Sequence, residues 1–279
     1  MIYNLGSINA DYIYRVPHLP APGETLAAEG LTRDLGGKGA NQSVAAALAG
    51  SSVRHIGAVG ADGAWTVEAL EEYGVVSSDI MRVDTPTAHA IINVDASGEN
   101  AIVLFAGANR QLSLAQLETA LSDASPEDSL LLQNETNLQA VAAELARSRG
   151  MKVIYSAAPF DEQAVTEVLP WVDILVMNAV EASAIGQTPR CQMIITRGAQ
   201  GADWIADGQT IHSPAFAVTP VDTTGAGDCF IGYAAAGLDQ GLSLQEALRL
   251  GSAAAALQVT KPGTSRAIPT RADVELFLS

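Results

Sequence analysis

The sequence has few of the residues that mark several large classes of protein. It holds two cysteines in 279 residues, Cys191 and Cys229, and no C-x-x-C pair. Neither a disulfide framework nor a zinc site is indicated, and a reducing cytoplasm is expected. Lysine occurs only three times, and the formal net charge is −16. A surface of that charge repels phosphate backbones and anionic membranes, which argues against nucleic-acid and peripheral-membrane binding.

Long apolar runs are also missing. The segment that begins at Met1 lacks a basic n-region and a long apolar h-region, so no signal peptide is predicted. Acidic residues such as Asp173 and Glu181 interrupt every candidate membrane span. We therefore expect a soluble, cytoplasmic protein. Hydrophobic residues nevertheless make up 48% of the chain and charged residues only 16%, a composition that buries a large core and excludes intrinsic disorder.

What the sequence does contain is an alternation of short β-branched runs with runs rich in alanine and leucine. This pattern is typical of an α/β fold, in which helices cover a mainly parallel sheet. Strands are predicted at 53–59, 130–133, 152–155, 174–177 and 193–196. Helices are predicted at 40–49, 65–73, 113–122, 138–149, 228–236 and 244–257.

Two segments break the alternation. Residues 8–16 and 90–105 are predicted to be extended, and the second folds back as a hairpin at Ser97-Gly98-Glu99-Asn100. A hairpin and an early strand do not join a parallel sheet easily, so we expect them to form a small separate β-layer. No internal repeat and no long linker divides the chain. We therefore predict one α/β domain over residues 1–279 with a β-appendage.

A glycine-rich stretch at 221–230, V-D-T-T-G-A-G-D-C-F, is the strongest candidate for a site. Its Asp228 opens an apolar helix, after two glycines and an alanine. Small residues let the backbone approach a ligand closely, and amides at a helix start bind anions and stabilise developing negative charge. Asp228 is therefore either an acid that favours the helix dipole or a general base beside a phosphate-binding hole.

A second glycine cluster, G-G-K-G-A-N-Q at 36–42, precedes another alanine-rich helix. It lacks the spacing of a Walker loop, and no G-x-G-x-x-G follows the first strand, so a dinucleotide fold is disfavoured. Taken alone, the cluster indicates no more than a turn. The stretch Asn9-Ala10-Asp11 offers polar groups for hydroxyl recognition, although Asx turns are a commoner use of such residues.

Five motifs occur in a fixed order: N-A-D at 9–11, P-G-E-T at 22–25, G-G-K-G-A-N-Q at 36–42, G-A-N at 107–109 and D-T-T-G-A-G-D at 222–228. Together they resemble the ribokinase (phosphofructokinase-B) family of carbohydrate kinases, over residues 4–269. The resemblance implies a ribokinase-like three-layer α/β/α sandwich with a mainly parallel central sheet. It also implies a small β-sheet lid, at about 8–35 and 85–106, and a homodimer paired through the exposed edges of the lids.

The chemistry that the resemblance implies is transfer of the γ-phosphate of ATP to the 5-hydroxyl of D-ribose, giving ribose 5-phosphate and ADP. Asp228 would be the catalytic base, and the amides of Gly225, Ala226 and Gly227 would form the anion hole. Phosphoryl transfer needs alignment and charge stabilisation more than covalent help. A family member acting on deoxyribose, another sugar or a nucleoside is the alternative. A non-catalytic sugar or nucleotide sensor is a further one.

For the sugar, the resemblance points to carboxylates and amides, which accept and donate hydrogen bonds to neighbouring hydroxyls. The expected sugar-binding residues are Asn9, Asp11, Gly37, Lys38, Asn41, Glu135 and Asp228. Among them Lys38 is placed to approach either the sugar or the phosphate. The alternative for Glu135 is a solvated loop acid, and the alternative for Lys38 is a surface lysine.

For the nucleotide, the resemblance points to two further elements. N-A-V-E at 178–181 matches the family's Asn-x-x-Glu element, in which Asn178 and Glu181 act on Mg²⁺ and phosphate largely through water. T-R-G-A-Q-G at 196–201 resembles the family's nucleotide loop, so Thr196, Gly198 and Gly201 are expected to bind ATP together with Asn178, Gly225 and Gly227. The alternative for Glu181 is an acid in the first turn of a helix.

A monovalent-cation site is also implied. Asp222, the carbonyl of Thr224 and the loop that contains Gly263 match a potassium site of the family, and oxygen ligands suit K⁺. Ala267 stands where family members often have serine, so one ligand would be missing.

The chain departs from the family pattern in length as well. Only 11 residues separate Glu181 from Met193, where relatives usually fit a longer helix before the next strand. This departure concerns the periphery of the sheet rather than the catalytic end.

Overall fold

The chain is built around one large sheet. The computed structural model describes residues 1–185 and 189–279. Within them, strands pair in the order β13-β12-β11-β10-β9-β8-β1-β4-β5. Their bounds are β1 Ile2–Leu5, β4 Val53–Val59, β5 Ile80–Arg82, β8 Ser129–Leu132, β9 Lys152–Ser156, β10 Ile174–Asn178, β11 Gln192–Thr196, β12 Ala202–Ala206 and β13 Gln209–Ser213. Neighbours from β5 to β11 pair in parallel, and β12 and β13 add antiparallel pairings at one edge.

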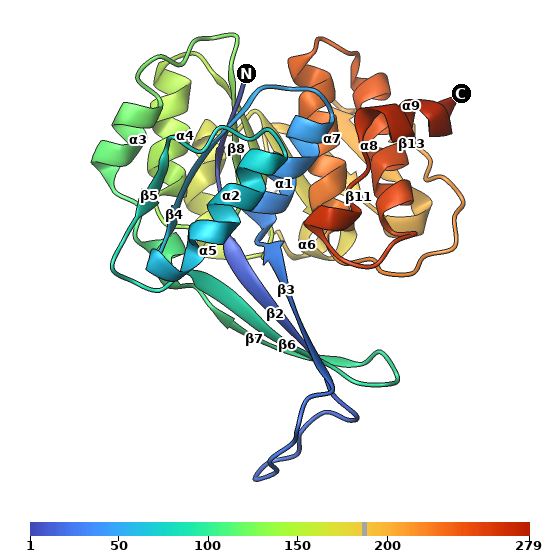
Figure 1. Cartoon of the computed structure of the whole chain (residues 1–279). Helices are drawn as coiled ribbons and strands as arrows, with labels where there is room; N and C mark the ends of the chain where they lie inside the picture. The colour runs from blue at the N-terminus through green and yellow to red at the C-terminus, as the bar shows by residue number, and fades with distance from the viewer. Residues whose placement is uncertain (186–188) are drawn as a thin grey trace.

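Helices cover both faces of this sheet. They are α1 Lys38–Leu48, α2 Ala64–Glu72, α3 Leu114–Ala120, α4 Gln139–Ser148, α5 Glu162–Val168, α6 Ala179–Ala184, α7 Ala226–Asp239, α8 Leu244–Gln258 and α9 Arg271–Leu278. Successive residues of a strand face opposite layers, so Ile2 belongs to the apolar core of α1, α7 and α8, whereas Tyr3 belongs to that of α3, α4 and α5. Figure 1 shows α7, α8 and α9 grouped apart from α3 and α4. The predicted three-layer sandwich is confirmed.

A second, smaller sheet extends away from this body (Figure 1). It consists of β2 Asn9–Arg15, β3 Gly30–Gly36, β6 Ala88–Val94 and β7 Asn100–Phe105, in the order β3-β2-β6-β7. β6 and β7 form the predicted antiparallel hairpin, and β2 pairs in parallel with β6. The predicted lid of two separate chain segments is therefore confirmed as a small, mostly antiparallel sheet. We call these four strands the lid.

Several elements of the structure are absent from the sequence prediction: β1, β3, β5, β12, β13, α5, α6 and α9. β1 is only four residues long and contains the polar residue Asn4, which is buried. The Asn4 amide donates to the Gly39 carbonyl and to Ser43 Oγ, both at 2.8 Å, and these bonds offset the cost of burying it. β5 has three residues, and α5, α6 and α9 have seven, six and eight. Such short elements contain too few periods of a hydrophobic pattern to be recognised.

The short connection between Glu181 and Met193 is seen only in part. α6 ends at Ala184 and β11 begins at Gln192, while residues 186–188 lie outside the described residues.

None of the helices in the described residues is long and apolar enough to cross a membrane.

Candidate active site

Two helix starts and three strand ends meet at the carboxyl-terminal edge of the parallel strands. α1 begins after Gly37 and α7 after Gly225, and both glycines have positive φ angles, 92° and 76°, that favour glycine. Glu135 follows β8, Asn178 ends β10 and Thr196 ends β11. Ligands of open α/β sheets bind outside this edge. The fold therefore brings the predicted residues to the place where a ligand would bind.

Asp228 lies in the first turn of α7 with only 7% of its surface exposed. Its Oδ1 accepts a hydrogen bond from Gln42 Nε2 (2.9 Å), and its Oδ2 accepts one from Asn41 Nδ2 (3.2 Å). Burial raises the pKa of Asp228, although the Lys38 ammonium and these two amides favour the charged form. A buried carboxylate whose pKa is raised in this way is a stronger proton acceptor than an ordinary aspartate.

The start of α7 offers backbone amides beside this carboxylate. Gly225 is the N-cap residue and no side chain caps the helix. The amide of Ala226 donates to the Thr223 carbonyl at 3.3 Å, so this member of the predicted anion hole already has a partner. A side chain added at Gly227 would meet nothing within 4 Å, which shows that the space in front of the turn is open. An uncapped helix start of this kind attracts anions.

Lys38 is half-buried at the start of α1, between acidic groups from three other elements. The carboxylates of Asp228, Glu135 and Glu181 raise the pKa of Lys38, with Asp228 acting most strongly and burial acting in the opposite direction. A lysine in free solvent would not have three carboxylates acting on it. The surface-lysine alternative is therefore not supported.

Two buried acceptors without a partner lie among the predicted sugar residues. They are Oδ1 of Asp11, in β2, and Oδ1 of Asn41, in α1. Burial raises the pKa of Asp11 to about 7, and the negative charges of Glu135 and Asp34 add to this effect. Glu135 itself is held in place, because its Oε2 accepts from Ser7 Oγ (2.5 Å) and from the Lys38 amide (2.9 Å). The two unpartnered acceptors can bind hydroxyl donors of a ligand.

Asn9 is placed at the junction of the lid with the body. Its side-chain oxygen accepts from Asn109 Nδ2 at 2.9 Å, and Asn109 Oδ1 accepts from the Ile8 amide at 3.0 Å. Asn109 lies in the G-A-N motif that follows β7. The amide nitrogen of Asn9 donates none of these bonds and is left to contact a ligand.

Asn178 and Thr196 are direct neighbours at the ends of β10 and β11. Asn178 caps α6: its side chain accepts from the amides of Val180 and Glu181, and Glu181 Oε2 accepts from the Asn178 amide at 2.8 Å. This reciprocal capping is the helix-acid alternative raised for Glu181. The other oxygen of the Glu181 carboxylate, Oε1, takes no part in the capping bonds. Gly198 and Gly201 follow Thr196 in the turn after β11.

The predicted potassium residues also come together. Asp222 Oδ1 accepts from the Thr224 amide (2.9 Å), and Asp222 Oδ2 accepts from the Gly263 amide (3.0 Å). Although burial opposes it, these two amides hold the pKa of Asp222 below its ordinary value. The Thr224 carbonyl accepts from Gln258 Nε2 at 3.2 Å. In this structure the carboxylate and the carbonyl are thus bonded to protein donors.

Across residues 1–185 and 189–279, no three His, Cys, Asp or Glu side chains are grouped as a metal site. Sequence reasoning missed Ser7, Gln42, Asn109 and Gln133, which hold the predicted residues in place. Gln42 and Asn109 lie inside the quoted motifs, so the sequence did contain a signal for them. Ser7 and Gln133 lie outside the motifs and contact the site through hydrogen bonds that span long stretches of sequence.

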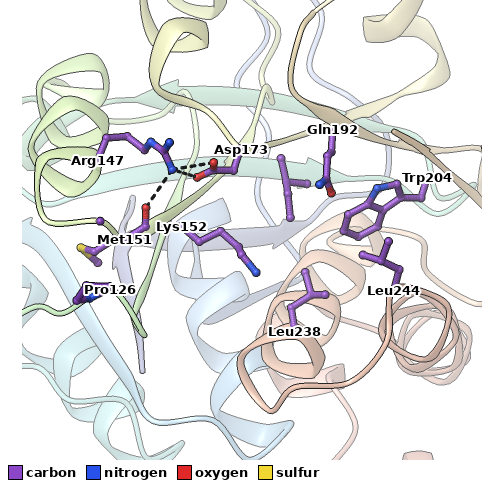
Figure 2. Close-up of a pocket in the computed structure, with 11 residues that line it drawn as sticks. Pro126, Arg147, Met151, Lys152, Asp173, Gln192, Trp204, Leu238 and Leu244 are labelled. Atoms are coloured by element: carbon purple, nitrogen blue, oxygen red, sulfur yellow. Dashed lines mark hydrogen bonds and ion pairs between the residues drawn. The ribbon is translucent and has the colours of Figure 1, made fainter. Parts of the chain in front are cut away.

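Another pocket lies at the opposite edge of the sheet and contains none of these residues. It is lined by residues at the starts of β9, β10 and β11 and at the end of α7. Figure 2 shows Arg147 bonded to Asp173 and to the Met151 carbonyl at one side of it, with Trp204 and Leu244 at the other. Asp228 lies in the first turn of α7, and Leu238 near the end of α7 lines this pocket. The length of α7 therefore separates the pocket from Asp228.

Comparison with known proteins identifies the family of the chain. A model of the pfkB family of carbohydrate kinases matches residues 1–271. A ribokinase of Haemophilus influenzae is 37% identical over 297 aligned residues, covering 98% of this chain and 97% of the relative. A deoxyribokinase of Salmonella typhi is 32% identical, covering 99% and 97%. The structure of Arabidopsis thaliana ribokinase complexed with ribose and ATP superposes with a TM-score of 0.89 at 28% identity, covering 100% and 98%.

These matches define the class of protein as a phosphotransferase that acts on an alcohol group of its acceptor. The chain belongs to the pfkB family of carbohydrate kinases, and the resemblance drawn from the five motifs is confirmed.

Proposed function

We propose that the protein transfers the γ-phosphoryl group of ATP to the 5-hydroxyl of D-ribose, giving ribose 5-phosphate and ADP. The observation that carries this proposal is the buried Asp228, which lies in the first turn of α7 and is held by Asn41 and Gln42 of α1. Relatives described as ribokinases, matched over nearly their full length, support ribose as the acceptor.

In this proposal the sugar binds between the lid and the start of α1. Oδ1 of Asp11 and Oδ1 of Asn41, which lack partners, accept hydrogen bonds from its hydroxyls. Glu135 accepts another hydroxyl through the carboxylate oxygen that Ser7 and Lys38 do not occupy. Gly37 and the amide nitrogen of Asn9 complete the hydroxyl contacts.

Asp228 takes the proton of the 5-hydroxyl as that oxygen attacks the γ-phosphorus. The new oxygen–phosphorus bond forms while the bond from the γ-phosphorus to the bridging oxygen breaks, and ADP leaves with that electron pair. The amides of Gly225, Ala226 and Gly227 stabilise the negative charge on the transferred group, Ala226 by giving up its long bond to Thr223. The Lys38 ammonium offsets the charge of the phosphates.

The nucleotide lies along the ends of β10 and β11, against Asn178, Thr196, Gly198 and Gly201. As in other kinases, ATP is used with a divalent metal, which we take to be Mg²⁺. Glu181 would hold it through water, which fits a carboxylate with one uncommitted oxygen. The metal would supply positive charge to the phosphates.

Potassium activation is a separate part of the proposal. Asp222, the Thr224 carbonyl and the loop around Gly263 supply oxygen atoms within one small region. In this structure the backbone amides of Thr224 and Gly263 donate hydrogen bonds to Asp222. To bind K⁺, the loop would have to turn carbonyl oxygens toward the ion. The side chain of Ala267 adds no oxygen ligand there.

We further propose that two copies associate through their lids in the cytoplasm, where ATP is made available. Apolar side chains of the lid are exposed, and they include Leu31, Ile102, Val103, Leu104 and Phe105. β7 is an edge strand whose residues are all exposed, which favours pairing with a second chain.

Deoxyribose is the second candidate acceptor, because a deoxyribokinase matches the chain nearly as well as the ribokinases do. A site that offers unpartnered acceptors to hydroxyls discriminates against a sugar that lacks one of them. We therefore expect ribose to be preferred.

The experiment that tests the function is ADP release with ribose, deoxyribose, other pentoses, hexoses and nucleosides, each with and without K⁺. The proposal predicts the highest kcat/KM for ribose. A higher value for deoxyribose or a nucleoside would assign a different acceptor. Absence of ADP release with every one of these acceptors would indicate the sensor alternative, against which family membership already weighs.

A further inference from the structure

A chain of buried side-chain hydrogen bonds leads away from Asp228 into the body of the protein. Gln42 is fully buried, and its Nε2 donates to Asp228 Oδ1 at 2.9 Å. The other end of the same amide, Oε1, accepts from Gln133 Nε2 at 2.7 Å. Gln133 Nε2 also donates to Asn4 Oδ1 at 2.9 Å. Both ends of the Gln42 amide therefore have a partner.

The far end of this chain is a backbone carbonyl. Asn4 Nδ2 lies 2.8 Å from Ser43 Oγ, which lies 2.8 Å from His55 Nδ1, and His55 Nε2 lies 3.1 Å from the Gly6 carbonyl. A carbonyl only accepts, so Nε2 carries the hydrogen. Burial lowers the pKa of His55 to about 4, so the ring is neutral and Nδ1 is an acceptor. Ser43 therefore donates to His55 and accepts from Asn4.

The direction of every bond follows from this. Because Asn4 uses its nitrogen on Ser43, its oxygen faces Gln133, and Gln133 must present its NH₂ group to both Asn4 and Gln42. Gln42 must then turn its oxygen to Gln133 and its NH₂ group to Asp228. If the Gln42 amide were reversed, an oxygen would face the carboxylate and two NH₂ groups would face each other.

We propose that Gln42, oriented by Gln133, is a positioning residue for the catalytic base. By donating to Oδ1 of Asp228 it fixes the plane of the carboxylate and leaves Oδ2 to receive the proton of the sugar hydroxyl. The bond that Asn41 gives to Oδ2 is longer, 3.2 Å, and is released when the sugar arrives. The inference rests on the proposed role of Asp228 as the base.

The test is the variant Gln42→Met, which keeps the size of the side chain and removes the donor. We expect kcat to fall roughly 10- to 100-fold as the base loses its orientation, while the KM values for sugar and ATP stay nearly unchanged. Loss of the donor also raises the pKa of Asp228, so the acid limb of kcat moves to higher pH. The charged groups that act on Asp228, Lys38 and Glu135, are the same in both proteins.

Gln133→Met leaves Gln42 free to reverse and should shift kcat and the acid limb in the same direction by a smaller amount. Gln116→Met is the matched control. Gln116 is also buried and donates two bonds, to the carbonyls of Gly57 (2.8 Å) and Asp79 (2.7 Å), outside the chain to Asp228. It should lower Tm as Gln42→Met does and leave kcat and the acid limb unchanged.

A second readout separates this inference from the proposed function. The pKa of the Asp228 carboxyl can be followed by ¹³C NMR of protein labelled at aspartate, with Asp228→Asn to assign the signal. A higher pKa in Gln42→Met supports the inference even if no sugar proves to be a substrate, an outcome that would refute only the function. An unchanged pKa overturns the inference. The inference is also overturned if Gln42→Met has the kcat of wild type, or if it lowers Tm as Gln116→Met does without changing kcat or the acid limb.

Discussion

The junction of α1 with α7 and the surface of the lid depart from ordinary protein composition in opposite ways. At the junction, polar side chains such as Asn41, Gln42 and Asp228 are buried, where apolar groups are the rule. On the lid, apolar side chains such as Val103 and Leu104 are exposed. Burial of the first group is offset by hydrogen bonds, whereas nothing in the described chain covers the second. The difference supports the proposed chemistry at the first region and the proposed association at the second.

Among variants that leave Asp228 itself intact, removal of the Lys38 charge at the junction should have the largest effect. Lys38→Met leaves Asp228, Glu135 and Glu181 facing the phosphates of ATP without the ammonium that offsets them. We expect kcat to fall about 10²- to 10³-fold, as when a preorganised charge-stabilising donor is lost. Lys152→Met, in the pocket at the opposite edge of the sheet, is the matched control and should turn over like wild type. Equal losses in both variants would contradict the assignment of Lys38.

Loss of a single sugar acceptor should have a smaller effect that is confined to the sugar. Asp11→Ala and Asn41→Ala each remove an acceptor and leave a ligand hydroxyl unpaired, at about 1–3 kcal/mol. This corresponds to a rise of roughly 5- to 150-fold in the KM for ribose. Steady-state kinetics at saturating ATP measures it, and the KM for ATP is the internal control. If the KM for ATP rises while that for ribose holds, the two residues do not form the sugar site.

At the lid, one charged substitution should change assembly. Leu104 lies in β7 with 66% of its surface exposed, so Leu104→Lys places a charge on an exposed apolar strand. We expect light scattering to show that the proposed dimer is converted to monomer. Leu276→Lys, in α9, alters a leucine that is 77% exposed and should remain a dimer. A wild-type protein that is monomeric at micromolar concentration and fully active would refute association through the lids.

The smallest expected effect is on stability, and it depends on pH. The pKa of Asp11 rises from 3.8 to about 7 on folding, so between these values the folded protein binds more protons than the unfolded chain. The contribution of Asp11 to stability therefore falls as pH rises from about 4 to 7 and is constant above that. Asp11→Asn removes this loss. The difference in Tm between Asp11→Asn and wild type, measured by calorimetry, should therefore increase by a few degrees as pH rises from about 4 to 7. A difference independent of pH would contradict the buried, ionisable state of Asp11.

Much of the fold was predictable because its buried strands contain continuous apolar runs, as at 130–132 and 174–177, and its helices are alanine-rich. β12 and β13 were missed because their residues are partly exposed and interrupted by polar side chains. The division of the chain into one domain stays a prediction.

The candidate site was predictable where residues lie in motifs that resemble a family, as with Asp228 and Asn41. The bonds that hold them were not. Ser7 and Glu135 are 128 residues apart, and Gln133 and Gln42 are 91 apart, so no local pattern connects them. Which atoms are left without a partner, such as Oδ1 of Asp11, depends on packing that only the folded chain shows.

The most direct test of the account is turnover by Asp228→Asn. Asparagine keeps the size of the side chain and suits a helix start, so the protein should fold and bind ATP much as wild type does. It cannot accept the proton at neutral pH. The account predicts that kcat, measured as ADP release with ribose on protein of unchanged Tm, falls about 10²- to 10⁴-fold. A folded Asp228→Asn protein that keeps more than about a tenth of wild-type kcat would show that Asp228 is not the base.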